Sequence, residues 1–139
     1  MNQRLQVGQR VSVTKSFSEE EVFQFAQLSQ DKNPLHLDKN FGRASIFGRR
    51  VVHGILVASL FSELIGMELP GPGSIYLGQN LIFKAPVAIG EPVTATVEIT
   101  KIREDKPIVT LRTVCLNSVG TTVIEGEAVV KYPNHIAQL

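Results

Sequence analysis

The stretch 52-VHGILVASLFSELI-65 decides the fold of this 139-residue chain. Its apolar side chains recur at helical spacing and cover most of the circumference of the predicted helix. A helix that is apolar nearly all round is buried nearly all round, so we expect this one to run through the core. It is too short and too polar to span a bilayer, which takes about 20 apolar residues. Gly66 is expected to cap its end.

After the turn at 70–73 the apolar pattern changes from a period of 3.6 to a period of 2, which is typical of strands. A meander of antiparallel strands that follows one buried helix predicts an α+β architecture, with a curved antiparallel sheet wrapped around one long central helix. The open edge of such a sheet favours dimerisation. The predicted strands cover residues 74–83, 93–100, 108–116 and 121–132.

Upstream of the long helix, the pattern predicts one short strand and one helix. Residues 11–17 alternate, and Ser18 and Glu21 have the spacing of a capping box, so a helix is expected to begin at Ser18. Pro34 is expected to end this helix, because proline disfavours the helical conformation of the residue before it. Residues 37–50 have no clear period and are expected to form a loop that can include a helical turn.

The composition, 43% apolar and 19% charged, is typical of a globular protein, and we expect a single domain over residues 1–139. A net charge of +1 and the lack of a basic cluster argue against nucleic acid or a membrane surface as partner. Cys115 is the one cysteine, which favours a reducing compartment. No apolar signal core follows Met1. The sequence therefore predicts a cytoplasmic protein.

Asp31 and His36 are the candidate acid–base pair. They lie five residues apart in the run 29-SQDKNPLH-36, and a turn at Asn33–Pro34 brings both side chains to one point. A water held between them can lose a proton to one group while the other acts on the substrate carbon, which typically contributes about 10²–10⁴-fold in rate. The alternative is structural: an aspartate in a turn and a half-buried histidine bonded to backbone.

The second candidate is the backbone at the start of the long helix. The Gly54 amide falls in the first turn, where amides lack intrahelical partners, and glycine lets a ligand carbonyl approach closely. The helix dipole favours negative charge on that oxygen, as an enolate formed from a thioester requires. The alternative is that Gly54 allows a strand to cross tightly over the helix, which His53 caps.

A helical face that starts at this glycine passes Ser62 and Ile65, and we expect it to line an acyl chain. Val130, on the last strand beside the helix, is a further candidate for chain-length selection. For Ser62 a bond to its own helix, and for Ile65 core packing, are the alternatives. Asn33 and His53 are also expected to contact substrate. Three scattered histidines and one cysteine show no metal-ligand spacing, so no metal site is predicted.

The run 31-DKNPLH-36 resembles the hydratase 2 motif, Asp-x-Asn-Pro-Leu/Ile/Val-His. Two positions depart from the family pattern: Gln30 stands where glycine is frequent, and Gly42 stands where alanine or serine is frequent. Both departures affect loop rigidity but remove no catalytic atom. The resemblance extends from about Val7 to Pro133. Two further runs are typical of MaoC-like dehydratases: 52-VHG-54 and 83-FKAPV-87. Two others resemble the short (R)-specific enoyl-CoA hydratases that feed polyhydroxyalkanoate synthesis: 70-PGPGSIYLGQ-79 and 103-REDKP-107.

The resemblance implies a hot-dog fold and a homodimer whose sites are completed near the subunit interface. It implies reversible syn hydration of a trans-2-enoyl-CoA to an (R)-3-hydroxyacyl-CoA. Asp31 and His36 would be the catalytic pair, with Asp31 activating water and His36 delivering the proton, or the reverse, and the Gly54 amide would polarise the thioester carbonyl. No cofactor is implied, since CoA is part of the substrate and the thioester itself acidifies the alpha carbon.

Three other functions are compatible with the same fold. A 3-hydroxyacyl-ACP dehydratase would run the reaction in the other direction on an acyl carrier protein, for which Arg43, Arg49, Arg50 and Lys84 are a candidate basic docking patch. A thioesterase would need water attack at the carbonyl, which the motif does not suggest. A non-catalytic acyl-thioester-binding module is the alternative outside enzymes.

Overall fold

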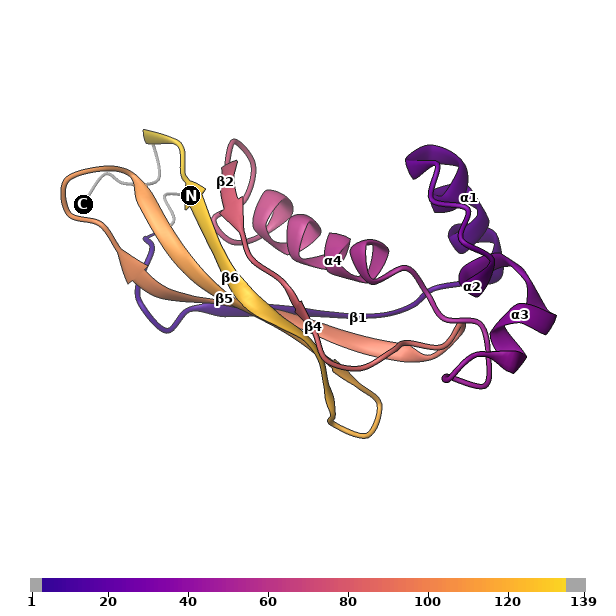
Figure 1. Ribbon diagram of the computed structural model, residues 1–139. Coiled ribbons are helices and arrows are strands. Elements are labelled where there is room, and N and C mark those ends of the chain that lie inside the picture. Colours follow the sequence, from indigo (N-terminus) through magenta and orange to yellow (C-terminus); the bar gives the residue numbers. More distant parts are fainter. Residues whose placement is uncertain (1–3, 135–139) are drawn as a thin grey trace.

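The computed structural model describes residues 4–134, in which one six-stranded antiparallel sheet curves around one side of a long helix (Figure 1). The strand order is β1-β4-β5-β6-β2, and the short strand β3 also pairs with β6. This arrangement confirms the predicted α+β hot-dog architecture. The strands are β1 (Arg10–Ser16), β2 (Ile75–Gln79), β3 (Ile82–Phe83), β4 (Pro92–Ile102), β5 (Ile108–Asn117) and β6 (Thr122–Lys131).

The long strands form the centre of the sheet because their side chains alternate between core and solvent. In β4 the residues Val93, Ala95, Val97 and Ile99 are all buried, as their period of 2 predicts. The opposite face of the same strand is polar, and its threonines bond across to β1, with Thr94 Oγ1 2.8 Å from the corresponding Thr14 oxygen. The sheet thus presents one apolar face, against which a helix packs.

Helix α4 (Gly54–Met67) lies along the concave side of the sheet (Figure 1). Its buried face comprises Val57, Leu60, Phe61, Leu64 and Ile65. The prediction that this helix is buried nearly all round is wrong for the single chain, because the sheet covers only one side: Ile55 is 57% exposed and Met67 68%. The helix also continues past Gly66 to Met67, with Glu68 as its C-cap, so Gly66 does not end it.

The segment predicted as one strand over 74–83 forms two short strands instead. Its pairing with β6 shifts register between Tyr76 and Gly78, and the pairing resumes in β3. At the break the backbone carbonyl of Asn80 lies against Gly126, where a Cβ would collide with it. The Asn80 side chain accepts from the Glu127 amide at 2.6 Å, and this local bonding interrupts the regular ladder.

Three short helices precede α4 and form a layer at one end of the sheet (Figure 1): α1 (Glu19–Ser29), α2 (Pro34–Leu37) and α3 (Lys39–Ala44). The predicted capping box is present, since Ser18 Oγ accepts from the Glu21 amide at 3.1 Å and Glu21 Oε1 accepts from the Ser18 amide at 3.0 Å. Pro34 does not end α1, which stops at Ser29 because Gln30 has a left-handed conformation with φ 66°. Pro34 instead begins α2, as its fixed φ allows at a first helical position.

The segment 37–50, expected to be a loop that can include a helical turn, contains the six-residue helix α3. Asp38 starts this helix because its Oδ1 accepts from the amides of Asn40 at 2.9 Å and Phe41 at 3.1 Å, the usual chemistry of an N-cap. Within residues 4–134, every helix falls short of the length and apolar character that a bilayer crossing requires.

Candidate active site

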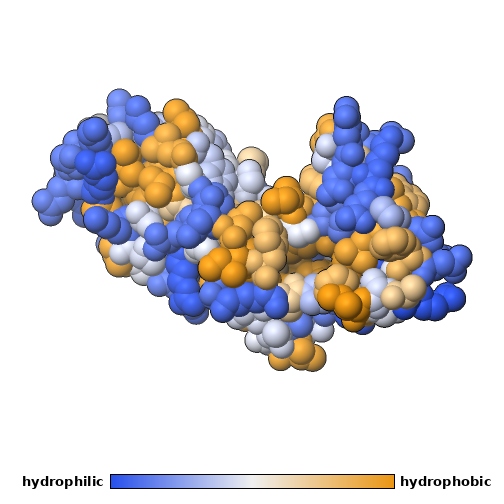
Figure 2. Space-filling view, viewed as in Figure 1, coloured by the Kyte–Doolittle hydropathy of each residue, from blue (hydrophilic) through white to orange (hydrophobic). Residues whose placement is uncertain are grey.

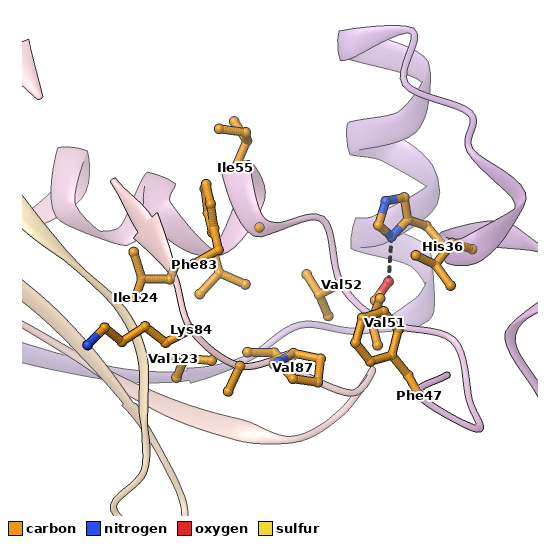
Figure 3. Close-up of a pocket in the computed structure, with 15 residues that line it drawn as sticks. His36, Phe47, Val51, Val52, Ile55, Phe83, Lys84, Val87, Val123 and Ile124 are labelled. Atoms are coloured by element: carbon orange, nitrogen blue, oxygen red, sulfur yellow. Dashed lines mark hydrogen bonds between the residues drawn. The ribbon is translucent and has the colours of Figure 1, made fainter. Parts of the chain in front are cut away.

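His36 lies on α2 with one ring nitrogen fixed and the other free. Asn33 caps this helix, since its Oδ1 accepts from the Leu35 amide at 3.0 Å. The buried His36 ring places Nδ1 2.7 Å from the Val51 carbonyl oxygen (Figure 3). A carbonyl only accepts hydrogen bonds, so Nδ1 carries the proton and Nε2 is left as the reactive nitrogen.

His53 packs against the His36 ring and helps to hold it in this position. Its ring is 2% exposed and stacks on the His36 ring, with centroids 3.8 Å apart and planes inclined by 26°. Its Nε2 donates to the Asp31 carbonyl oxygen at 2.9 Å, and Phe25 packs edge-on against its other face, with centroids 4.9 Å apart. Burial lowers the pKa of His53, so the ring stays neutral. His53 is not among the residues that line the neighbouring apolar pocket, and its contact with substrate stays a prediction.

Asp31 lies in the exposed loop between α1 and α2. Its amide donates to Ser29 Oγ at 3.1 Å, and its Oδ1 accepts from the Asn33 amide at 3.2 Å. A carboxylate oxygen of Asp31 and one ring nitrogen each of His36 and His53 all lie within 4.8 Å of one another. The two residues that the sequence analysis paired are therefore close enough to share one water.

This cluster offers the nitrogen and oxygen atoms that metal ions bind. The prediction that the histidines are scattered is therefore wrong for His36 and His53. The geometry does not suit a metal ion, however. Because the rings of His36 and His53 are stacked with centroids 3.8 Å apart, their lone pairs lie in two nearly parallel planes and do not converge on one point, as the ligands of a tetrahedral site must. The donor set fits proton transfer better than metal binding.

Next to His36 lies a pocket of about 390 Å³ that begins at the first residue of α4. Gly54 is that residue, and its amide has no intrahelical acceptor. The Phe83 ring packs so closely that a Cβ on Gly54 would lie 2.6 Å from Phe83 Cε1, which explains the glycine. The helix start thus offers an amide and its positive dipole end to a ligand carbonyl in the pocket.

The pocket walls are almost wholly apolar, and Figure 2 shows a hollow bordered by apolar side chains between the sheet and the α1–α3 layer. The charged group among them, Lys84, is paired with Glu125 at 2.9 Å. In Figure 3 the lining runs from His36 and Phe47 at one end, past Ile55 and Phe83, to Ile124 and Lys84 at the other. Such walls suit a hydrocarbon chain and exclude bulk water.

The remaining predicted contact residues lie elsewhere. Ser62 is on the exposed side of α4, and Ile65 and Val130 are buried in the core; none of the three lines this pocket. Asn33 acts as a helix cap, as described above. The Val51 carbonyl that fixes the His36 tautomer could not be found from the sequence, because a backbone acceptor leaves no pattern in residue types.

The curved sheet and the single long helix define a hot-dog fold, and the cluster of Asp31, His36 and His53 at the helix start suits the hydratase and dehydratase class of this fold. The sequence model of the MaoC-like domain family matches residues 2–119, and the chain belongs to this family. It is 56% identical to an (R)-specific enoyl-CoA hydratase of Aeromonas caviae, over 94% of this chain and 98% of that protein. It is 39% identical to a mitochondrial 3-hydroxyacyl-[acyl-carrier-protein] dehydratase of Arabidopsis thaliana, over 94% of this chain and 79% of that one.

A solved structure shows the same architecture. The (R)-hydratase of A. caviae involved in PHA biosynthesis superposes with a TM-score of 0.91 at 56% identity, covering 93% of this chain and 98% of that one. The R-hydratase PhaJ1 of Pseudomonas aeruginosa, in its unliganded form, superposes with a TM-score of 0.88 at 39% identity, covering 93% of this chain and 83% of that one.

Proposed function

We propose that this protein is an (R)-specific enoyl-CoA hydratase, a hydro-lyase that adds water reversibly to trans-2-enoyl-CoA and forms (R)-3-hydroxyacyl-CoA. The observation that carries the proposal is the free Nε2 of His36 beside the Asp31 carboxylate, next to an apolar pocket that begins at the Gly54 amide. The similarity to named hydratases supports the same reaction.

The thioester carbonyl binds at the start of α4. Its oxygen accepts from the Gly54 amide, and the helix dipole stabilises the negative charge that develops there. This polarisation draws electrons from the double bond and makes C3 of the enoyl group electrophilic. The apolar walls strengthen the interaction, because charges attract more strongly where water is excluded.

Water is activated at the Asp31 carboxylate, which takes one of its protons while the water oxygen bonds to C3. The electron pair of the double bond moves onto the thioester as an enolate. The proton taken by Asp31 then passes to the free Nε2 of His36, which delivers it to C2, so that both groups return to their starting states. Because both groups stand on the same side of the site, hydroxyl and hydrogen add to the same face, which supports the syn course.

The thioester supplies the acidity that this reaction needs, so we propose that it proceeds without a further cofactor. The one cysteine, Cys115, is buried and unpaired, which fits action in the cytoplasm.

We also propose that the working unit is a homodimer. The β2–β3 edge and the outer side of α4 expose large apolar side chains, including Ile55, Met67, Leu77 and Ile82. A second copy of the chain would cover this surface and protect the open sheet edge. Light scattering after size exclusion tests this: we expect a dimer that Leu77→Lys converts to monomer. A monomeric wild-type protein would contradict the proposal.

The reaction is tested with crotonyl-CoA, by loss of enoyl absorbance coupled to a dehydrogenase specific for (R)-3-hydroxyacyl-CoA. We expect Asp31→Asn to lower kcat by about 10²–10⁴-fold, the range of general acid–base catalysis. Asp105→Asn, which removes the same charge from an exposed turn, is the matched control and should keep full activity. An active Asp31→Asn variant overturns the mechanism, and an S product overturns the stereochemistry.

The carrier-linked alternative is separated by substrate. The 39% identity to a dehydratase named for an acyl-carrier-protein substrate makes it the second candidate. Turnover of crotonyl-carrier protein with none of crotonyl-CoA would favour it, whereas efficient turnover of crotonyl-CoA supports the hydratase. Binding of either thioester without turnover would favour a non-catalytic module.

A further inference from the structure

A second hollow, of about 300 Å³, lies beside the apolar pocket and is strongly basic. Four of its lining residues carry positive charge: Lys39, Arg43, Arg49 and Arg50. Three of these, Arg43, Arg49 and Arg50, belong to the candidate docking patch predicted from the sequence, and the structure adds Lys39. Lys84, the fourth member of that patch, lines the apolar pocket instead.

The two hollows are neighbours because the same two chain segments, 47–52 and 84–89, line both. These segments are tied together by the Val52 amide, which donates to the Val87 carbonyl at 2.8 Å, and by a bridge between Val51 and Ala88. A ligand whose reactive end reaches His36 through the apolar pocket can therefore place its other end at these cations.

The basic hollow is held in place by backbone packing. Gly42 of α3 lies so near the following loop that a Cβ would be 2.6 Å from the Arg50 amide nitrogen and 2.8 Å from the Arg49 carbonyl carbon. This contact sets Arg43 of the helix against Arg49 of the loop. It also gives the glycine at position 42 a physical reason, since a larger residue would push the two groups of cations apart.

The cations are only partly neutralised. Arg50 is committed to Glu19, at 2.9 Å, and its side chain is 11% exposed. Arg49 lies 4.0 Å from Glu91 at the limit of an ion pair. Within residues 4–134, Lys39 and Arg43 have no carboxylate within ion-pairing distance. The hollow thus keeps unsatisfied donors that suit a multiply charged anion.

We propose that this basic hollow binds the phosphate groups of the CoA moiety, with Lys39, Arg43 and Arg49 as ligands. The inference rests on the proposed function, because acyl-CoA carries its thioester and its phosphates at opposite ends of the flexible pantetheine arm. With the thioester at Gly54, the phosphates remain outside the apolar pocket, where charge-assisted bonds to arginine and lysine select them. A walled hollow with clustered cations fits phosphate better than the extended acidic surface of a carrier protein.

The test compares crotonyl-CoA with crotonyl-pantetheine, which has the same thioester and no phosphate. In the double variant K39Q/R43Q we expect kcat/KM for crotonyl-CoA to fall by about 10-fold, as for the loss of two partly exposed charged contacts. The loss should lie in KM, with kcat unchanged, and crotonyl-pantetheine should be used as well as before. Lys106→Gln, in the β4–β5 turn at the other end of the sheet, is the control for charge alone.

The outcomes separate the two proposals. If the wild-type protein hydrates neither thioester, the proposed function fails. If it hydrates both and the double variant keeps its KM for crotonyl-CoA, or loses activity equally on both substrates, the phosphate site is wrong. If the double variant loses activity only with crotonyl-carrier protein, the hollow is a carrier-docking surface and the proposal is overturned.

Discussion

The substitution Gln30→Gly tests whether backbone strain is stored beside the acid–base pair. Among the described residues, Gln30 is the non-glycine residue with positive φ, at φ 66° and ψ 10°. A left-handed conformation costs an L-residue about 1–2 kcal/mol, whereas glycine adopts it freely but loses about 0.5–1 kcal/mol more conformational entropy on folding. We therefore expect Gln30→Gly to raise the free energy of unfolding by about 0.5–1 kcal/mol.

No other interaction offsets this gain. The exposed Gln30 side chain has no hydrogen bond to any described residue, and its carbonyl, which accepts from the Lys32 amide at 3.1 Å, is kept in the variant. Urea denaturation at one fixed protein concentration measures the change. Gln30→Ala is the control, because it keeps a Cβ and should show no comparable gain. A Gln30→Gly protein no more stable than wild type would refute the strain argument.

Activity should be unchanged in Gln30→Gly, since three bonds other than the strained residue hold Asp31. They come from its amide to Ser29, from the Asn33 amide to its carboxylate and from His53 to its carbonyl. A fall in kcat without a change in stability would show that strain at position 30, and not this bonding, sets the position of the carboxylate.

Three further predictions concern buried or closely packed groups. His53→Phe keeps a stacked ring on His36 but leaves the Asp31 carbonyl unbonded, so we expect kcat to fall and unfolding free energy to drop by about 1–3 kcal/mol; His53→Gln, which restores a donor, should recover part of the kcat, and equal losses in both variants would contradict a positioning role. Gly54→Ala places a methyl group against the neighbouring aromatic ring, so stability should fall by about 1–3 kcal/mol, measured by urea denaturation, and crotonyl-CoA turnover should fall with it as the helix start moves; unchanged stability and turnover would show that this close contact does not set the position of the amide. Burial raises the pKa of the Cys115 thiol to about 12, so at pH 8 it should stay protonated and react with a thiol reagent only after unfolding, and rapid labelling of the native protein would contradict this.

Much of the fold follows from local patterns that need no tertiary knowledge. The capping box at Ser18 formed as predicted because both of its bonds are made within one turn. The alternation in β4 and β5 predicted their buried faces correctly. Predicted strand limits were wrong where a distant segment determines them. The predicted strand over 74–83 is divided in two because Asn80 is hydrogen-bonded to β6.

The positions where helices end also depend partly on local sequence and partly on structure that the sequence does not reveal. Pro34 disfavours a helical residue before it, and Asn33 is indeed non-helical, with φ −53° and ψ 127°, but α1 ends earlier, at Ser29. The sequence could not show that Gln30 would adopt a left-handed conformation, which glycine would have indicated. Likewise glycine is a frequent helix terminator, yet α4 continues for one residue past Gly66, and its last turn is closed by the Glu68 amide, which donates to the Leu64 carbonyl at 3.0 Å.

The placement of Ser62, Ile65 and Val130 shows why chain-length selection cannot be assigned from one chain alone. Ile65 and Val130 are buried in the core, where they support α4 against the sheet, while Ser62 points away from it. In the proposed homodimer the outer side of α4 would be covered by the second copy, and a channel that continues past Gly54 along this helix would then have one wall from each subunit. Ser62 would line such a channel directly, whereas Ile65 and Val130 would act on its width through the packing of the helix. Exchanging Ser62 for a larger residue should therefore shift substrate preference toward short chains in the dimer while leaving the stability of the core unaffected.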